Sequence, residues 1–595
     1  MAIQYHIREG KVIVRLTGRI CETADELLAS DLFAEMVRRC VQKLSCRQST
    51  LLGIFGDQGT VAEEDIQVLV STLQFLAKIP GHLVPNIVEG SQRFLANPQL
   101  LNDFVEYLYN YWREYDRFVV CDSVGDGPDS RPYRTFNATV EHLTHLVRRT
   151  YRDVQENITG AHPRIYRQVR AGAEMAAISL PKDIPYPTDT YRKLKGVSVI
   201  RQVLLNPPVI LNPPINKRTG EFQRVSLNPL ELVDISNDEW LCYPAKVGSL
   251  LITVYFHEKF FELGYSLSNL FELADDDCLQ RQPDGVYMFG VPPDALDGLG
   301  VFPTVFYDDE EHDMLVAAVP RRDEFGYFGY LKKMVLTLHN IKMMKRGKLP
   351  FHGALVKISL RPDREATVLL IGDTGAGKSE TLEALRALGE EFIRDIVIVA
   401  DDMGSLDIDP SGNILGYGTE IGAFLRLDDL QPGYVFGQMD RSIIMSPGQV
   451  NARVVLPVTT FDAVMKGHRI DFILYANNYE PIDAAHPILE RFDTPARALG
   501  VFRQGAAMSK GTTTSTGLVE SYFANIFGPP QYQGLHEALA ARYFDAFFEG
   551  GLYVGQMRTR LGLPGWEMAG PRESARELLR VILSDQTGLG QLKGV

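Results

Sequence analysis

The sequence VLLIGDTGAGKSE at residues 368–380 decides the fold of the C-terminal half of this chain. Its first four residues are apolar and predict a short buried strand. The pattern G-x-x-x-x-G-K-S follows at Gly372–Ser379, and residues 380–388 (ETLEALRAL) then show the apolar spacing of a helix. A strand, a glycine loop and a helix in this order predict a phosphate-binding P-loop.

The residues of this loop have distinct expected roles. Glycines let the backbone turn tightly with its N–H groups pointing inward, and the helix N-terminus adds the positive end of its dipole. The Lys378 side chain is expected to reach the terminal phosphates, and the Ser379 hydroxyl to bind a divalent metal. The predicted nucleotide-binding residues are Gly372, Asp373, Thr374, Gly375, Ala376, Gly377, Lys378 and Ser379.

An acidic pair follows the next predicted strand. Residues 396–400 (IVIVA) are an apolar run of the kind that forms a buried strand, and Asp401 and Asp402 come directly after it. Aspartate is also common in turns after strands. Beside a P-loop, however, an acidic strand end is the Walker-B arrangement, which holds the metal that bridges the phosphates. The pair therefore predicts metal ligands.

Further charged residues flank these two motifs. Residues 327–344 predict a helix that carries the adjacent lysines Lys332 and Lys333 near its start, and His352 stands at the start of a predicted strand. After the acidic pair, Arg453 precedes another apolar strand. Adjacent lysines usually lie on a solvated surface, so these residues gain meaning only from their order around the P-loop.

Length and composition predict a soluble multidomain protein. The chain has 595 residues, 45% hydrophobic and 23% charged, which allows about three or four domains. Its net charge of −14 disfavours a nucleic-acid partner. The six cysteines have no metal-site spacing, which indicates a reducing compartment. The N-terminus lacks the pattern of a signal peptide and the apolar runs are too short to span a bilayer, so we expect a cytoplasmic protein without a membrane partner.

The sequence predicts an α/β fold in three parts. Residues 1–180 begin with two short strands and then show mainly helical periodicity, as at 63–76 and 140–154, which predicts a mainly helical domain of unknown role. Proline pairs at 207–208 and 213–214 predict an extended connector. Residues 181–324 predict a mixed α/β substrate-side domain, and residues 325–595 the P-loop catalytic domain.

The order of the motifs resembles phosphoenolpyruvate carboxykinase over roughly residues 325–585. That family has Tyr-x-x-x-x-Lys-Lys, a His on a strand, the P-loop, an Asp-Asp pair and Asn-x-Arg-Val-x-x-Pro in this order. The matching residues here are Tyr327, Lys332, Lys333, His352, Gly372–Ser379, Asp401, Asp402, Asn451, Arg453 and Pro457. A small-residue stretch around Gly511 and the segment 520–528 resemble the family's Gly-Thr-Glu region. The family's substrate-arginine segment has no clear match, and residues 217–220 (KRTG) and Arg224 are the nearest candidates.

The resemblance implies a phosphoenolpyruvate carboxykinase-like C-terminal domain that decarboxylates oxaloacetate and phosphorylates the resulting enolate. It implies a nucleotide and a small carboxylate as ligands, with ATP, GTP or pyrophosphate as phosphoryl donor. The implied ligands of Mn²⁺ are Lys333, His352 and Asp402, and Ser379 is the implied ligand of the nucleotide's Mg²⁺. Lys332, Lys378 and Arg453 would face the transferred phosphoryl group, and Tyr327 would orient the carboxylated substrate.

Two other function classes remain open. HPr kinase/phosphorylase is similar at His352-Gly353, Gly372–Glu380 and Val399–Asp402, which implies a kinase that acts on a protein or a small hydroxyl substrate. A non-catalytic nucleotide-binding regulator is the third class. The helical N-terminal part and the missing arginine segment favour these two classes. The lysine pair, His352 and Arg453 favour the carboxykinase, because a mere binder does not need a second metal site.

Overall fold

The computed structural model describes residues 4–8, 10–16, 21–56, 61–122, 136–162, 171–361, 364–373, 375–388, 392–427, 436–509 and 517–584. The chain is a mixed α/β protein with several mixed sheets. It divides into an N-terminal unit, residues 1–180 with 200–206, and a C-terminal unit, residues 181–199 with 207–595. Each unit has its own core and is described by itself.

The N-terminal unit contains strands as well as helices. Its strands run side by side in the order β1 (Gln4–Arg8), β2 (Lys11–Leu16), β3 (Asp116–Asp122), β4 (Met175–Leu180) and β5 (Val199–Leu205). The β1–β2 hairpin confirms the two predicted N-terminal strands, and helices α1 to α6 confirm the mainly helical pattern that follows, which β3 interrupts. The apolar run FVVC within β3 is too short for periodicity to distinguish a strand from a buried helical turn.

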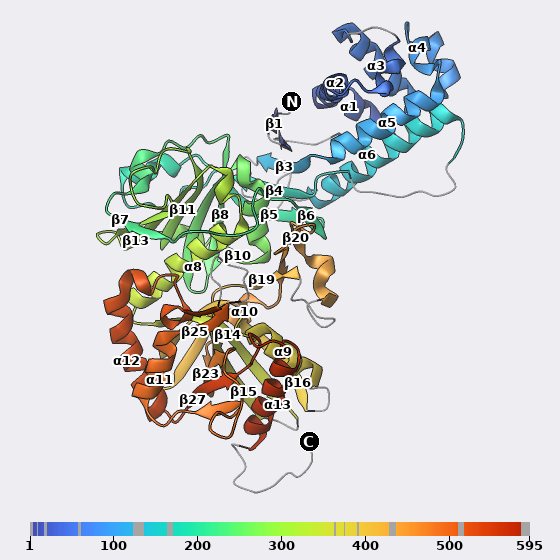
Figure 1. Ribbon diagram of the computed structural model, residues 1–595. Helices are drawn as coiled ribbons and strands as arrows, with labels where there is room; N and C mark the ends of the chain where they lie inside the picture. The colour runs from blue at the N-terminus through green and yellow to red at the C-terminus, as the bar shows by residue number, and fades with distance from the viewer. Residues whose placement is uncertain are drawn as a thin grey trace. The chain divides into compact units, whose positions relative to one another are not determined.

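Six α-helices make up the rest of the described N-terminal unit. They are α1 (Ala24–Leu28), α2 (Asp31–Cys46), α3 (Glu63–Leu76), α4 (Gln92–Leu95), α5 (Pro98–Arg113) and α6 (Phe136–Thr159). The predicted helices at 63–76 and 140–154 are thus confirmed as α3 and α6. The long helices α5 and α6 lie side by side (Figure 1). Their apolar faces pack with α2 and α3 into one core.

The first sheet of the C-terminal unit precedes the P-loop in the sequence. Its strands follow the order β8 (Trp240–Val247), β9 (Leu250–His257), β11 (Gly285–Val291), β13 (Met314–Pro320), β12 (Val305–Asp309) and β7 (Gln223–Val225), and β10 (Glu272–Leu273) pairs with β8. Helix α7 (Phe261–Ser266) and strand β6 (Val209–Leu211) are two shorter elements of the same unit. The strands β8, β9, β11 and β13 are almost entirely buried.

Helix α8 (Phe328–Lys345) confirms the helix predicted at 327–344 and is the centre of this unit. It contacts β8 and β11 of the first sheet and also β14 (Leu349–Leu360) and β17 (Met403–Ile408) of the second. Sixteen of its eighteen residues are therefore buried, including Lys332. A helix buried on all sides cannot present its lysines to bulk solvent, so Lys332 needs an internal anionic partner.

The second sheet holds the P-loop. Its order is β22 (His468–Arg469), β18 (Ile414–Gly418), β17, β14, β15 (Arg364–Ile371), β23 (Phe472–Asn477), β27 (Tyr553–Arg558) and β24 (Leu489–Arg491), and β16 (Ile393–Ala400) pairs with β14. Strands β15, β23 and β27 are parallel, so their carboxyl ends meet at one edge. Helices α9 (Lys378–Leu388) and α13 (Ala569–Ser584) pack together against this sheet (Figure 1).

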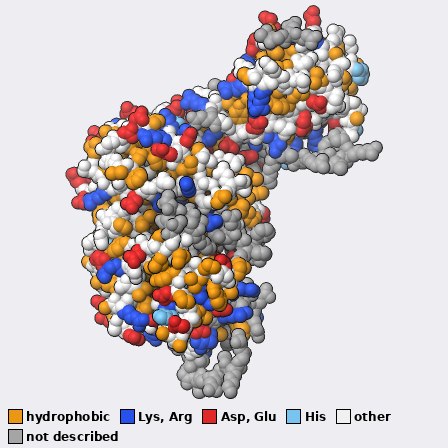
Figure 2. Space-filling model, in the orientation of Figure 1, with side chains coloured by type: hydrophobic (Ala, Val, Ile, Leu, Met, Phe, Trp, Pro, Cys, Tyr) orange, Lys and Arg blue, Asp and Glu red, His pale blue; other side chains and the backbone are white. Residues whose placement is uncertain are grey.

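The unit contains further strands and α-helices. They are β19 (Gly422–Arg426), β20 (Ile443–Met445), β21 (Arg453–Pro457), β25 (Ala506–Ser509), β26 (Gly517–Glu520), α10 (Phe461–Met465), α11 (Pro495–Gln504) and α12 (Gln533–Glu549). In the part of the chain that the structure describes, no helix is long and apolar enough to cross a membrane. Acidic and basic side chains are interspersed over the face drawn in Figure 2.

Candidate active site

A cleft of about 690 Å³ in the C-terminal unit brings most of the predicted site residues together. The predicted residues that line it are Tyr327, Lys332, Lys333, Asp373, Gly375, Lys378, Ser379, Asp401, Asp402 and Arg453. His352 is buried beneath its wall, and Gly372, Ala376 and Gly377 form the buried side of the loop. Thr374 and the stretch around Gly511 lie outside the described residues.

Asp402 contacts three other polar side chains of the predicted site. Its Oδ2 lies 2.8 Å from Nζ of Lys332 and 2.7 Å from Nζ of Lys333, and its Oδ1 lies 2.9 Å from Nε2 of His352. Burial alone would raise the pKa of Asp402, but the ammonium groups of Lys332 and Lys333 hold it well below its usual value. The carboxylate is therefore ionised and joins residues from α8, β14 and the end of β16.

The two lysines differ in charge balance because only one of them has a second anionic partner. Lys332 lies 3.2 Å from a carboxylate oxygen of Glu420, which is 1% exposed. Asp402 and Glu420 together raise the pKa of Lys332 against the opposing effect of burial. Burial lowers the pKa of Lys333, and neighbouring Lys332 lowers it further although Asp402 acts against both. The site thus pairs a firmly charged lysine with one that deprotonates more readily.

Glu420 was not identified from the sequence. Burial raises the pKa of Glu420 to about 7. Glu420 contacts Lys332 but does not line the cleft. It precedes β19 in the segment GYGTEIGAF, which has neither a motif nor helical periodicity. The only available signal was an acidic residue between two apolar stretches, and that pattern is common in loops.

His352 has a defined hydrogen-bonding state. Its Nδ1 lies 2.6 Å from the carbonyl oxygen of Ala524, so Nδ1 must donate a proton to that oxygen. Burial and the nearby Lys333 lower the pKa of His352, which favours the neutral ring. Nε2 lies 2.9 Å from Oδ1 of Asp402, where it donates a hydrogen bond when the ring is protonated and offers a lone pair when the ring is neutral.

The P-loop has the backbone that its glycines predict. Gly375 and Gly377 have φ values of +80° and +93°, a region that side-chain-bearing residues rarely adopt. Burial lowers the pKa of Lys378, whose Nζ donates to the carbonyl oxygens of Gly372 at 2.5 Å and Asp373 at 2.8 Å. Binding of a phosphate by Lys378 would therefore require it to exchange these carbonyl contacts for phosphate oxygens.

Two side chains from neighbouring strands brace this loop. Asn478 follows β23, and its Nδ2 donates to the carbonyl oxygens of Gly375 and Met508, both at 2.9 Å. Thr559 follows β27, and its hydroxyl donates to the carbonyl oxygen of Ala376 at 2.7 Å. A side chain at position 377 would begin 2.7 Å from Thr559, so the glycine there is also required by packing. We call Asn478 and Thr559 the P-loop brace.

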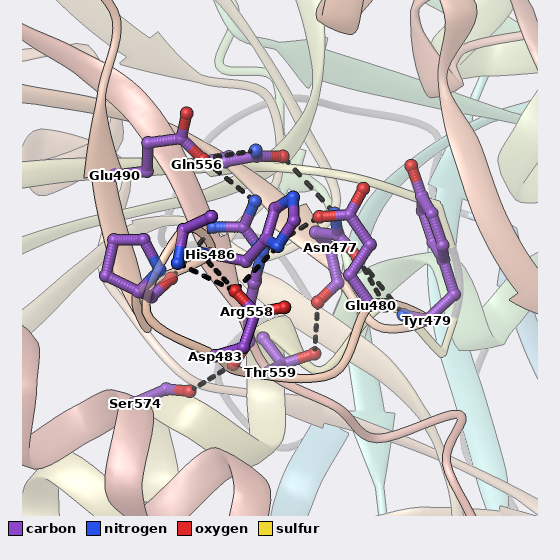
Figure 3. Close-up of polar contacts among 12 residues, drawn as sticks. Asn477, Tyr479, Glu480, Asp483, His486, Glu490, Gln556, Arg558, Thr559 and Ser574 are labelled. Carbon is purple, nitrogen blue, oxygen red and sulfur yellow. Dashed lines mark hydrogen bonds and ion pairs between the residues drawn. The ribbon is translucent and has the colours of Figure 1, made fainter.

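A buried ionic network holds the brace from behind (Figure 3). Arg558 is 1% exposed, and its guanidinium donates to Glu480 and Glu490 at 2.8 Å each and to the carbonyl oxygen of Pro487 at 2.8 Å. Gln556 also donates to Glu490 at 2.9 Å. Because Thr559 follows Arg558 directly, this network fixes the strand end that carries the brace.

We expect Thr559→Val to weaken nucleotide binding about five- to tenfold, because it removes one hydrogen bond of roughly 1 kcal/mol that fixes the loop. Isothermal titration with ATP and GTP measures the effect. Thr559→Ser keeps the hydroxyl and should bind within about twofold of the wild type. A larger loss in Thr559→Ser than in Thr559→Val would show that the methyl group, and not the hydroxyl, supports the loop.

Arginines and aromatic rings form the other walls of the cleft. The Arg453 guanidinium lies 5.4 Å from the centre of the Phe424 ring, and Tyr327 packs against the same ring. Arg218 lies near the rings of Phe222 and Phe527, at 5.3 and 5.1 Å, and its guanidinium donates a hydrogen bond to the carbonyl oxygen of Gly220. Burial lowers the pKa of Arg218.

The structure separates the two candidates for a substrate-binding arginine. Residues 217–220 line the cleft and place Arg218 in it. Arg224 does not line the cleft, since its guanidinium pairs with Glu310 at 2.8 Å and lies over the ring of Tyr532. Arg218 is therefore the residue of this segment that can meet a carboxylate.

The remaining predicted metal ligands have a looser arrangement. Asp401 and Ser379 both line the cleft, and burial raises the pKa of Asp401 to about 6. Among the described residues, no three His, Cys, Asp or Glu side chains gather into a metal-binding group. The nitrogen donors that lie beside Asp402 are Nε2 of His352 at 2.9 Å and Nζ of Lys332 and Lys333 at 2.8 and 2.7 Å.

A comparison of the chain with protein-family models finds no match, and a comparison with curated proteins finds none either. The function must therefore be inferred from the residues of the cleft and their geometry.

Proposed function

We propose that this protein is a phosphoenolpyruvate carboxykinase-like phosphoryl transferase. The observation that carries the proposal is the convergence of Lys332, Lys333 and His352 on Asp402, in a cleft that also contains the P-loop. A nucleotide-binding protein needs only the loop. A second group of cations and metal-binding atoms beside it is suited to an acceptor that becomes negatively charged during the reaction.

The donor set beside Asp402 fits a divalent cation. The neutral His352 ring offers Nε2, Asp402 offers a carboxylate oxygen, and the lowered pKa of Lys333 favours the neutral amine that a metal requires. A set of two nitrogens and one oxygen is compatible with Mn²⁺. A cation there would supply the positive charge that stabilises an enolate oxygen.

The phosphoryl side of the proposed reaction uses the P-loop. The loop N–H groups and Lys378 would bind the phosphates of the donor, with Mg²⁺ on the Ser379 hydroxyl. Arg453 and Lys332 line the same cleft and would balance the charge on the transferred group. Lys332 suits this task because Glu420 keeps it charged even if a metal draws Asp402 away from it.

The acceptor side uses Arg218 and Tyr327. In the proposed reaction the C–C bond to the departing carboxylate of oxaloacetate breaks and its electrons form the enolate. The enolate oxygen then attacks the terminal phosphorus of the donor, and the nucleoside diphosphate leaves. Arg218 is the free-standing cation suited to the remaining carboxylate, because its packing near Phe222 and Phe527 desolvates and orients it. Tyr327 lies in the same wall of the cleft.

The direct test is to incubate the full-length protein with oxaloacetate, Mn²⁺, Mg²⁺ and each phosphoryl donor in turn, and to measure phosphoenolpyruvate. We expect product with one donor. Nucleotide binding without product from any donor would overturn the carboxykinase proposal and favour a kinase for a protein or small hydroxyl substrate.

Lys378→Ala tests the P-loop part of the site, and Lys333→Ala tests the proposed metal-binding part. We expect Lys378→Ala to reduce phosphoryl transfer by about 10³-fold or more through lost charge stabilisation. Lys333→Ala should also abolish the dependence on Mn²⁺ while leaving nucleotide binding within about threefold. Lys348→Ala is the matched control, because Lys348 pairs with Asp407 outside the cleft. Full activity in either cleft variant would contradict the assignment.

A further inference from the structure

The loop that carries Arg218 into the cleft has no regular secondary structure, yet hydrogen bonds hold it on both sides of the arginine. On the first side, Nδ2 of Asn451 donates to the carbonyl oxygen of Asn216 at 2.5 Å. In return, Nδ2 of Asn216 donates to the carbonyl oxygen of Val450 at 2.5 Å. The start of the loop is therefore tied to the segment that leads into β21 and Arg453.

A single tyrosine hydroxyl holds the loop on the other side of the arginine. The Tyr330 hydroxyl accepts a hydrogen bond from the backbone N–H of Thr219 and donates one to the carbonyl oxygen of the same residue, both at 2.9 Å. One side chain thus pairs with both backbone groups of the residue that follows Arg218. Tyr330 is 1% exposed and makes a T-shaped contact with the ring of Phe325, so its hydroxyl has a fixed position.

Tyr330 and Lys333 both belong to helix α8. Residues three apart lie on the same face of a helix, so the group that holds the loop is about one turn from the proposed metal ligand. The ring of Phe527 lies against both cations, since its centre is 5.1 Å from the Arg218 guanidinium and 4.5 Å from Nζ of Lys333. The helix therefore sets the distance between Arg218 and the proposed metal site.

We propose that Tyr330 is a positioning residue that fixes Arg218 for the carboxylate of the acceptor. This inference rests on the proposed function, because it takes Arg218 as the carboxylate-binding residue. In oxaloacetate the carboxylate that remains is bonded to the carbon whose oxygen becomes the enolate, so Arg218 must meet it at a set distance from the metal site. Without the Tyr330 hydroxyl, water would solvate the exposed backbone of Thr219, and Arg218 would lose its fixed position while the fold remained.

The test is an isothermal titration of the full-length protein with L-malate in the presence of Mn²⁺. L-Malate has the carbon skeleton and both carboxylates of oxaloacetate but carries a hydroxyl in place of the keto group. We expect Tyr330→Phe to weaken L-malate about tenfold through the loss of the two hydrogen bonds. It should raise KM for oxaloacetate by a similar factor and leave kcat within about threefold, because the arginine is present but less often in position. Wild-type affinity for L-malate in Tyr330→Phe would overturn the proposal.

Arg218→Met tests whether Tyr330 acts through the arginine. Alone it should weaken L-malate about 30-fold, the loss expected for a hydrogen-bonded charge. Adding Tyr330→Phe to Arg218→Met should then change the affinity less than about twofold, since no arginine is left to position. A tyrosine with a merely structural role would cost the same with and without Arg218, and that result would overturn the proposal.

Tyr243→Phe is the matched control. It removes a buried hydroxyl outside the cleft, which donates to the carbonyl oxygen of Phe271 at 2.7 Å, and should leave the affinity for L-malate within about twofold. A tenfold loss in this control as well would overturn the proposal.

The outcomes also separate the role of Tyr330 from the proposed function. Binding of L-malate that depends on Tyr330, in a protein that forms no phosphoenolpyruvate, would support the positioning role and overturn the carboxykinase proposal. Formation of phosphoenolpyruvate with the same KM in the wild type and in Tyr330→Phe would support the carboxykinase proposal and overturn the role of Tyr330. No binding of L-malate to the wild type would overturn that role too.

Discussion

Asp402→Asn is expected to abolish phosphoenolpyruvate formation, with a loss of at least about 10³-fold in kcat. The amide has the same shape but no charge. It cannot balance Lys332 and Lys333, whose Nζ atoms lie 2.8 and 2.7 Å from the carboxylate, and it is a poor ligand for a divalent cation. The expected primary effect is loss of Mn²⁺ binding, which titration followed by electron paramagnetic resonance measures directly.

Stability should fall in the same variant. Removing one partner of a buried charge cluster typically costs about 3–5 kcal/mol, because the remaining charges stay desolvated. Glu420 still neutralises Lys332, so we expect the lower end of this range. Asp407→Asn is the matched control, since Asp407 pairs with the half-buried Lys348 and its loss should cost less than about 1 kcal/mol. Wild-type Mn²⁺ affinity in Asp402→Asn would exclude Asp402 as a metal ligand.

The parts of the site that could be predicted from the sequence are those marked by a pattern of neighbouring residues. The P-loop could be placed because its strand, glycines and helix are consecutive, and α8 because its apolar pattern continues over five turns. Lys332, Lys333, His352 and Asp402 could be grouped only through their order in the chain. Their contact depends on α8 lying between two sheets, which no local pattern encodes.

The missed residues share a physical reason. Glu420, Asn478 and Thr559 each follow or precede a short strand, and each acts through contacts with residues at least 80 positions away in the sequence. Asparagine, threonine and glutamate at such positions are usually turn residues. Only the parallel pairing of β15 with β23 and of β23 with β27 brings Asn478 and Thr559 to the P-loop. Strand β3 was missed for the different reason that its apolar run is short.

Arg558→Met is expected to have the largest effect on stability, a loss of about 3–5 kcal/mol in the free energy of unfolding of the C-terminal unit. Arg558 is 1% exposed and donates to both Glu480 and Glu490 at 2.8 Å. Methionine fills a similar space but leaves Glu480 without its arginine and leaves Glu490 with only the half-exposed Arg497. Because Thr559 follows Arg558, the P-loop brace should loosen and nucleotide affinity should fall in the same variant. Urea unfolding and nucleotide titration measure the two effects.

Arg497, a second arginine that pairs with Glu490, tests whether the stability loss in Arg558→Met comes from the burial of the arginine or from the ion pair alone. Arg497 also pairs with Glu490, but its side chain is 50% exposed, so Arg497→Met should cost less than about 1 kcal/mol. Adding Glu490→Gln to Arg558→Met removes one of the two carboxylates that lose Arg558 and should recover part of the lost stability, which no simple loss of side-chain packing would do. If Arg497→Met and Arg558→Met destabilised the protein equally, the burial of the Arg558 guanidinium would not matter. The network in Figure 3 would then not be what fixes the P-loop strand.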